Sequence, residues 1–459
     1  MQKERIKKIL PEIIASLEKK IPYASALVTA SEGNAIFIDN QEQRISEIIP
    51  TVGTVFTAFN GLYFEERAFS SVEERELLKE AKRLREEVYL QRGKIKINPG
   101  EPLVKDSHTT CQIDPRRMPL QEKFSRLKKL QAELQGLDKR IINARVSYQE
   151  VCEEKIFANR TRLLSQELLR TEIALVIFVS NGQRMEYDWL IKAKMAGWET
   201  TEIKEEEIDK LKNRALELLQ AEKITPGTYE VVADSSVSGT IAHEAFGHGV
   251  ELDMFLKNRA KGKDYISKRI ASPLVTMIDD PSLLGENGSY FFDDEGELAT
   301  PTIIIKDGVL LRGLSDLYSA SALRVPRSAN GRRESFARKT YARMSNTFFA
   351  KGESKIEEMI NSLEEGIYLE KASSGMEDPK NWGIQVEVKR GREVKSGRFT
   401  GKIFSPTMIT GYVPDLLKNI KAVGEDFSLE GGGLCGKGHK EYVRVSSGGP
   451  HLRLRARLG

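Results

Sequence analysis

Residues 240–253 read TIAHEAFGHGVELD and predict one short helix, beginning near Thr240, in a part of the chain that is otherwise strand-like. Asp307-Gly308 predicts a hairpin turn, because it lies between the apolar runs IIIK and VLLRG. The last residues, LRLRARLG, alternate apolar side chains with arginine, which is typical of a half-exposed strand. Residues 227–459 are therefore predicted to form a β-rich C-terminal domain that carries this helix.

Residues 1–97 predict an N-terminal α+β unit. Apolar residues recur at helical spacing over 1–20, and a capping box opens a second, charged helix at Ser71. Between the two helices lie short β-type runs. Glu32-Gly33-Asn34 and Asn60-Gly61 interrupt these runs and predict hairpin turns.

Residues 98–117 are rich in proline and predict a linker. Residues 118–226 predict a second α+β unit, in which helices near 119–137 and 203–222 flank three β-type runs. The predicted fold class is therefore α+β, with N-terminal units of helices and antiparallel strands followed by a mostly β C-terminal domain.

The composition is that of an ordinary globular protein with nearly balanced charge. Of 459 residues, 71 are Lys or Arg and 67 are Asp or Glu, which gives a formal net charge of +4. So small an excess argues against a protein that mainly neutralises nucleic-acid phosphates or coats an anionic membrane. Three cysteines are too few for a disulfide framework, and the longest strongly apolar run, residues 173–179, is too short to span a bilayer. We expect a cytoplasmic protein without a membrane segment.

The candidate chemistry lies in the helix at 240–253. The chain has five histidines, and two of them, His243 and His248, form an HExxxH pattern with Glu244. On a regular α-helix, a spacing of five residues turns the second ring away by about 140°. Two such rings can share a metal only where the backbone leaves α geometry. A π-type bulge or a helix end between the rings would allow this, and Gly247 permits either.

A catalytic zinc site needs a third protein ligand, and Cys435 in the glycine-rich stretch EGGGLCGKGH is the best candidate. Glu244 would then be the general base for the zinc-bound water and later the proton donor to the leaving amine. Glu251 and Asp253 are candidate partners for the free imidazole nitrogens.

Other interpretations of these residues stay open. A cysteine on its own is more often a buried apolar residue than a metal ligand. A thiol–imidazole pair of Cys435 and His439 would leave the HExxxH pattern unexplained. A phosphate-binding loop at 431–437 is rejected, because Gly438 stands where Ser or Thr would hold magnesium. A thiolate ligand favours zinc, with iron and manganese as alternatives.

These residues resemble the TldD/PmbA family, on its TldD side. His243, His248 and Cys435 match the family's zinc ligands, and Glu244 matches its catalytic glutamate. After Cys-Gly-Lys the family tends to continue with one residue and then Gly-Gln, whereas this chain has Gly438-His439-Lys440. Further matching motifs are Asp293-Asp294-Glu295-Gly296, Lys306-Asp307-Gly308-Val309-Leu310, Arg343-Met344-Ser345-Asn346-Thr347 and Gly433-Leu434-Cys435-Gly436-Lys437.

The resemblance implies a cytosolic zinc metallopeptidase that acts on peptides or unstructured polypeptides. It also implies a dimer that encloses the active site, either a homodimer or a heterodimer with a PmbA/TldE-type paralogue. An oxyanion donor is needed as well, and the sequence does not choose between Arg332, Arg333 and Tyr290.

Two interpretations from other functional classes remain. The first is a non-catalytic binding or scaffold subunit, although the intact HExxxH and cysteine residues count against it. The second is a regulator of a DNA-associated enzyme, an idea attached to this family by name. The small net charge and the lack of a nucleic-acid-binding motif argue against direct DNA binding.

Overall fold

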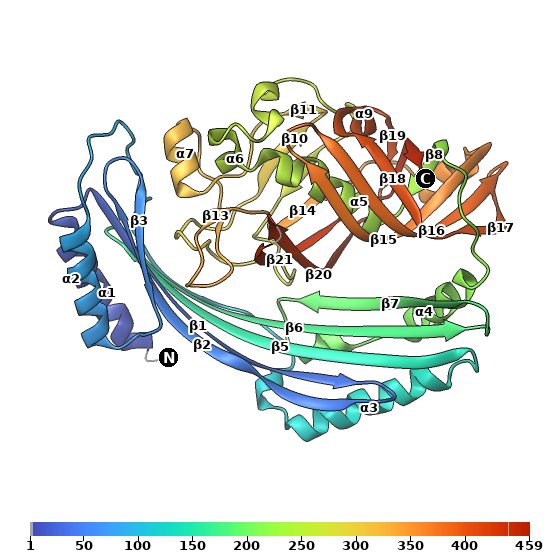
Figure 1. Cartoon of the computed structure of the whole chain (residues 1–459), viewed down its shortest axis with the longest axis horizontal. Helices are drawn as coiled ribbons and strands as arrows, with labels where there is room; N and C mark the ends of the chain where they lie inside the picture. The colour runs from blue at the N-terminus through green and yellow to red at the C-terminus, as the bar shows by residue number, and fades with distance from the viewer. Residues whose placement is uncertain (1–2, 439) are drawn as a thin grey trace.

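The computed structural model describes residues 3–438 and 440–459, which form three large β-sheets and a two-stranded one, with helices packed around them (Figure 1). This mixture of helices and strands confirms the α+β fold class. Within the described residues, no helix is both long enough and apolar enough to cross a membrane.

The first sheet belongs to the N-terminal half and has the order β3-β2-β1-β5-β6-β4, with β7 added beside β6. Its pairs are antiparallel except for β4, which runs parallel to β6. The strands are β1 (Tyr23–Ile38), β2 (Gln43–Phe59), β3 (Phe64–Phe69), β4 (Leu103–His108), β5 (Ile141–Asn159), β6 (Arg162–Ser180) and β7 (Met185–Lys194).

This sheet joins the two N-terminal units that the sequence suggested. β1 pairs with β5 from Ser25 to Ile38, so residues 1–97 and 118–226 contribute to the same sheet. The stretch 98–117, which was expected to be a linker, supplies β4 to its edge. The sequence pattern of each unit indicates its own strands. It does not show that strands far apart in the sequence pair with one another in a single sheet.

Helices pack on the face of this sheet that is turned away from the C-terminal half, and the last of them, at the β7 edge, also contacts that half (Figure 1). They are α1 (Lys3–Glu18), α2 (Glu74–Glu87), α3 (Leu120–Gly136) and α4 (Glu205–Leu218). On the other face, Leu27 and Phe157 pack against Phe292 of the C-terminal half. Nearby, Nζ of Lys155 donates to Oδ1 of Asp294 at 2.7 Å. The concave face of the sheet therefore holds the C-terminal half through apolar contacts and a buried ion pair.

The C-terminal half contains two further sheets, with helix α5 (Ser235–Ala242) packed between them. One sheet has the order β11-β10-β9-β14-β21-β20. In the other, β15-β8-β22-β18-β16-β17, the additional pairing of β15 with β16 closes a ring of strands. The bounds are β8 (Gly227–Ala233), β9 (Met277–Asp279), β10 (Thr302–Lys306), β11 (Val309–Leu310), β14 (Asn346–Phe349), β15 (Glu365–Asp378), β16 (Gly383–Lys395), β17 (Arg398–Phe404), β18 (Thr407–Tyr412), β20 (Ser428–Lys437), β21 (Lys440–Gly449) and β22 (Leu452–Leu458).

Helix α5 is held at both its start and its side. Oδ1 of Asp234 caps it by accepting from the backbone N–H of Val237 at 2.9 Å. A Cβ on Gly239 would lie 2.2 Å from the backbone nitrogen of Gly448, so only glycine lets the helix approach β21 this closely. These two contacts fix the position of helix α5, and with it the starting point of the segment that follows Ala242.

Candidate metal centre

The HExxxH segment leaves α-helical geometry, as its spacing predicted. A π-helical turn runs from His243 to Gly247, and a short 3₁₀ turn follows at His248–Val250. The rings of His243 and His248 lie 5.2 Å apart between centroids and are nearly perpendicular, at 89°. A Cβ on Gly247 would lie 1.9 Å from Sδ of Met344, so any other residue would require the buried Met344 side chain to shift. The π-helical turn, which is wider than an α-helical one, orients both imidazole rings toward the same point.

Cys435 of β20 completes a cluster of three donor atoms. Its Sγ lies 3.3 Å from Nε2 of His248, and one donor atom from each of His243, His248 and Cys435 lies within 4.8 Å of the others. Zinc bonds of about 2.0 Å to nitrogen and 2.3 Å to sulfur, at a tetrahedral angle, place two donor atoms about 3.5 Å apart. Nδ1 of His243 is buried and has no hydrogen-bond partner among the described residues. The donor set and its spacing therefore fit a zinc ion.

The cluster favours an ionised thiol. Burial raises the pKa of the Cys435 thiol, but the imidazoles of His248 and His243 lower it by more and hold it well below its usual value. Burial likewise opposes protonation of His248, yet Cys435 and Glu251 raise its pKa well above the usual value. The thiolate is the form of cysteine that binds metals, so the environment prepares Cys435 for that role.

Glu251 and Lys437 lie behind His248. Oε2 of Glu251 is 3.5 Å from Nδ1 of His248, and Nζ of Lys437 donates to the same Oε2 at 2.9 Å. Burial works against ionisation of Glu251, but Lys437 and His248 lower its pKa to about 2. Asp253 contacts Lys437, at 2.7 Å, and Lys257. Of the two carboxylates considered as imidazole partners, Glu251 is thus the one that faces an imidazole.

Arg343 is a residue of the site that sequence reasoning missed. Its buried guanidinium donates to the carbonyl oxygen of Cys435 at 2.6 Å and to Sγ at 3.1 Å, and also to the carbonyl oxygen of Glu441. Its Nε lies 3.6 Å from Oε1 of Glu251. Arg343 thus ties β20 and β21 together next to the thiol. Its place in the matching stretch Arg343–Thr347 was the available signal, but a contact with a residue 92 positions away leaves no local pattern.

Glu244 lies beside the cluster and against strand β15. A Cβ on Gly375 would lie 2.5 Å from Cγ of Glu244 and 2.8 Å from its Oε1. Because Gly375 has no side chain, the Glu244 side chain can occupy this space. Glu244 is partly exposed, which leaves its carboxylate accessible to a substrate.

The side chains considered as oxyanion donors line a separate cavity of about 210 Å³. Arg332 donates to the carbonyl oxygen of Arg444 at 2.8 Å, and Arg333 to Oε1 of Glu66 at 2.7 Å. The hydroxyl of Tyr290 donates to the carbonyl oxygen of Ala329. His439, the extra imidazole near Cys435, lies outside the described residues.

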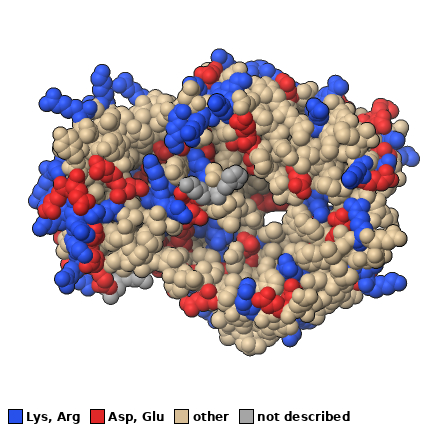
Figure 2. All heavy atoms as spheres, viewed as in Figure 1, with Lys and Arg blue, Asp and Glu red and all other residues tan. Residues whose placement is uncertain are grey.

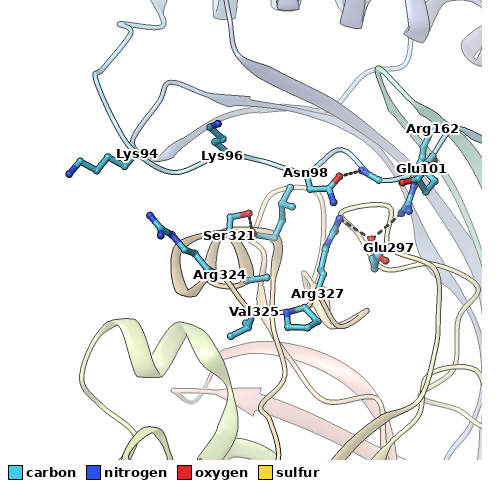
Figure 3. A pocket seen from close by; sticks show the side chains of 14 residues that line it. Lys94, Lys96, Asn98, Glu101, Arg162, Glu297, Ser321, Arg324, Val325 and Arg327 are labelled. Atoms are coloured by element: carbon cyan, nitrogen blue, oxygen red, sulfur yellow. Dashed lines mark hydrogen bonds and ion pairs between the residues drawn. The ribbon is translucent and has the colours of Figure 1, made fainter.

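Another cavity, of about 760 Å³, lies between the segment 94–101 and helix α7 (Leu317–Leu323) (Figure 3). Lys94, Lys96 and Arg324 are among its lining side chains, and none of the HExxxH residues line it. It is therefore distinct from the three-donor cluster.

Comparisons with known proteins place these observations in context. The model for the PmbA/TldA metallopeptidase C-terminal domain matches residues 226–457. A metalloprotease of Methanothermobacter thermautotrophicus is 30% identical over 372 residues, 79% of this chain and 79% of that protein. A zinc metalloprotease TldD homolog of Saccharolobus solfataricus is 25% identical over 73% of this chain and 75% of its own.

Two solved structures have a similar fold. A candidate modulator of a DNA gyrase from Thermotoga maritima matches with a TM-score of 0.80 at 16% identity, covering 99% of this chain and 100% of that one. TldE from Thermococcus kodakarensis matches with a TM-score of 0.76 at 15% identity, covering 98% and 99%. At this level of identity the likeness shows the shared fold.

Proposed function

Because the chain belongs to the TldD/PmbA family of metallopeptidases, we propose that it is a zinc-dependent peptidase that hydrolyses peptides or unstructured polypeptides. The observation that carries this proposal is the convergence of His243, His248 and Cys435 within 4.8 Å of one another. The zinc metalloprotease of Saccharolobus solfataricus supports zinc as the metal.

Each residue of the site has a distinct task in this proposal. His243, His248 and Cys435 hold the zinc ion, whose Lewis acidity lowers the pKa of water and polarises the peptide carbonyl when it is bound. Glu244 accepts the proton of the attacking water and later donates it to the leaving amine. Arg343 keeps the Cys435 strand in position through its contacts with the carbonyl oxygen and the thiol.

The proposed assembly is a cytoplasmic dimer that encloses the site, with a second copy or a PmbA/TldE-type paralogue as the partner. The similar fold of the Thermococcus kodakarensis TldE supports a partner of that type. A role on DNA is less well supported, because positive and negative side chains are interspersed over the face seen in Figure 2. The intact donor cluster also favours a catalytic subunit over a scaffold subunit.

The direct test combines metal analysis with a cleavage assay. We expect mass spectrometry to find about one zinc ion per chain, since three protein ligands and an open position define one catalytic site. The zinc-loaded protein should cleave an unfolded polypeptide, and a chelator should abolish cleavage until zinc is returned. A folded protein without bound metal would contradict the site. Zinc binding without cleavage, alone or with the paralogue, would contradict the peptidase function.

Gly375 offers a second test of the role of Glu244. In Gly375→Ala the new Cβ would displace the Glu244 carboxylate, and a small misplacement of a catalytic group costs about 10- to 100-fold in rate. We expect kcat to fall by this factor while the zinc content stays unchanged. Gly383→Ala, in the same hairpin, is the matched control, because a Cβ there would meet only Cβ of Asp378, at 4.0 Å. Equal rates for both variants would contradict the proposed position of Glu244 in catalysis.

A further inference from the structure

Glu377 lies on the inner side of strand β15, next to the proposed catalytic residue. Side chains alternate between the two faces of a strand, so Glu377 shares a face with Gly375, which contacts Glu244. Its partner in β16 is Ile384, and the partner of Gly375 is Val386; both are buried in the C-terminal core. Met376, between them, is 65% exposed on the opposite face. The Glu377 side chain therefore extends toward the site.

The carboxyl group of Glu377 has no partner of opposite charge. Within residues 3–438 and 440–459, no hydrogen bond or ion pair to its side chain is found. Burial raises its pKa to about 8, with Glu251 and Glu244 acting in the same direction and His248 against it. The nearby cation Lys437 is already bound to Glu251 and Asp253. A half-buried acid that lies near other acids and makes no ion pair is costly to the protein alone.

A positively charged group on a ligand would remove this cost. It would offset the burial of the carboxylate and its repulsion by Glu251 and Glu244, and would form a charge-assisted hydrogen bond. Because Glu377 follows Gly375 along the strand that lies against Glu244, such a group would sit close to the bond that Glu244 acts on. The cations that a polypeptide carries are its α-ammonium group and the side chains of lysine and arginine.

We propose that Glu377 is a specificity-determining residue, whose carboxylate binds a cationic amine of the substrate next to the scissile bond. The proposal rests on the proposed peptidase function and adds the substrate class: peptides with a free N-terminus or with a basic residue beside the cleaved bond.

The test measures peptide binding without turnover. Zinc-loaded Glu244→Gln protein is titrated calorimetrically with short peptides that combine a free or acetylated N-terminus with lysine or glutamine at one inner position. The same titrations are repeated with Glu377→Gln added. We expect Kd for the amine-bearing peptides to rise about 10-fold or more, as for the loss of a charge-assisted hydrogen bond, and Kd for the uncharged peptide to stay unchanged. The peptide that loses most affinity identifies the α-ammonium group or the lysine as the ligand.

Two further variants separate specificity from structure. Glu377→Asp keeps the charge and should retain part of the preference for cationic peptides. Glu387→Gln changes an acid of the same hairpin that contacts Ser374 on the other face, and should bind all peptides as before. Equal losses for charged and uncharged peptides in Glu377→Gln, or no difference between them before the change, would overturn the proposal. Failure of the proposed function would appear separately, as wild-type protein that binds no zinc or cleaves no peptide.

Discussion

Replacing Glu244 with glutamine is expected to lower the rate of polypeptide cleavage by about 10³-fold, because the loss of a positioned general base typically costs 10²- to 10⁴-fold. Glutamine has the same shape as glutamate, so it fits the space that Gly375 leaves beside the strand. Its amide cannot accept the proton of the attacking water. The measurement is kcat on an unfolded polypeptide, together with zinc content by mass spectrometry, which should remain that of the wild type.

The matched control for this variant is Glu358→Gln. Glu358 is an exposed acid of helix α8 (Ile356–Asn361) in the same half of the chain, and its replacement should leave both the rate and the zinc content unchanged. Cleavage by Glu244→Gln at the wild-type rate would contradict the role of Glu244 as the base. Loss of zinc from Glu244→Gln would show instead that this residue is needed to bind the metal.

The spacing of the HExxxH segment predicted that its backbone would leave α-helical geometry, through either a π-type bulge or a helix end. On a regular α-helix, a spacing of five residues turns the second imidazole away from the first. The two rings can therefore bind the same metal ion only if the backbone leaves α-helical geometry near Gly247. The π-helical turn from His243 to Gly247 is that departure. The long strands β5 and β6 were also expected, as β-type runs of the second α+β unit.

Contacts between distant segments are what the sequence could not reveal. Glu32-Gly33-Asn34 was predicted to be a hairpin turn, and this was wrong: β1 runs through it to Ile38. A Cβ on Gly33 would lie 2.1 Å from the carbonyl oxygen of Glu150 in β5, so the glycine marks a close approach between strands. The pairing with β2 also shifts register between Ser31 and Gly33. In the sequence, a glycine that lets two strands approach closely cannot be distinguished from a glycine that forms a turn.

The same limit applies to the site. His243, Glu244 and His248 are close in sequence and share a recognisable spacing. Arg343 and Gly375 act through contacts with residues on other strands and turns, and of the two only Arg343 lies in a stretch that matches the family's motifs. Short helices such as α9 (Val413–Lys418) were missed for a related reason, since six residues show too little periodicity.

Replacing Cys435 with serine is expected to weaken zinc binding by roughly 10³-fold, because a neutral hydroxyl replaces the thiolate that zinc prefers. The imidazoles of His248 and His243 keep the pKa of the Cys435 thiol low despite its burial, so the wild-type ligand is already anionic. A serine hydroxyl stays protonated in the same place, while Arg343 still has the carbonyl oxygen of residue 435 to bind. The measurement is the zinc dissociation constant, by competition with a chromophoric chelator.

Cys152→Ser is the matched control for that experiment. Cys152 is also buried, but it lies in β5 of the N-terminal sheet, where burial raises its pKa to about 11 and the thiol stays neutral. Its replacement should leave zinc affinity unchanged, because its thiol contacts Arg116 and is not part of the three-donor cluster. An equal fall in both variants would attribute the loss to the stability of the fold. Unchanged affinity in Cys435→Ser would remove Cys435 from the ligand set, leaving two imidazoles that are too few for a catalytic zinc.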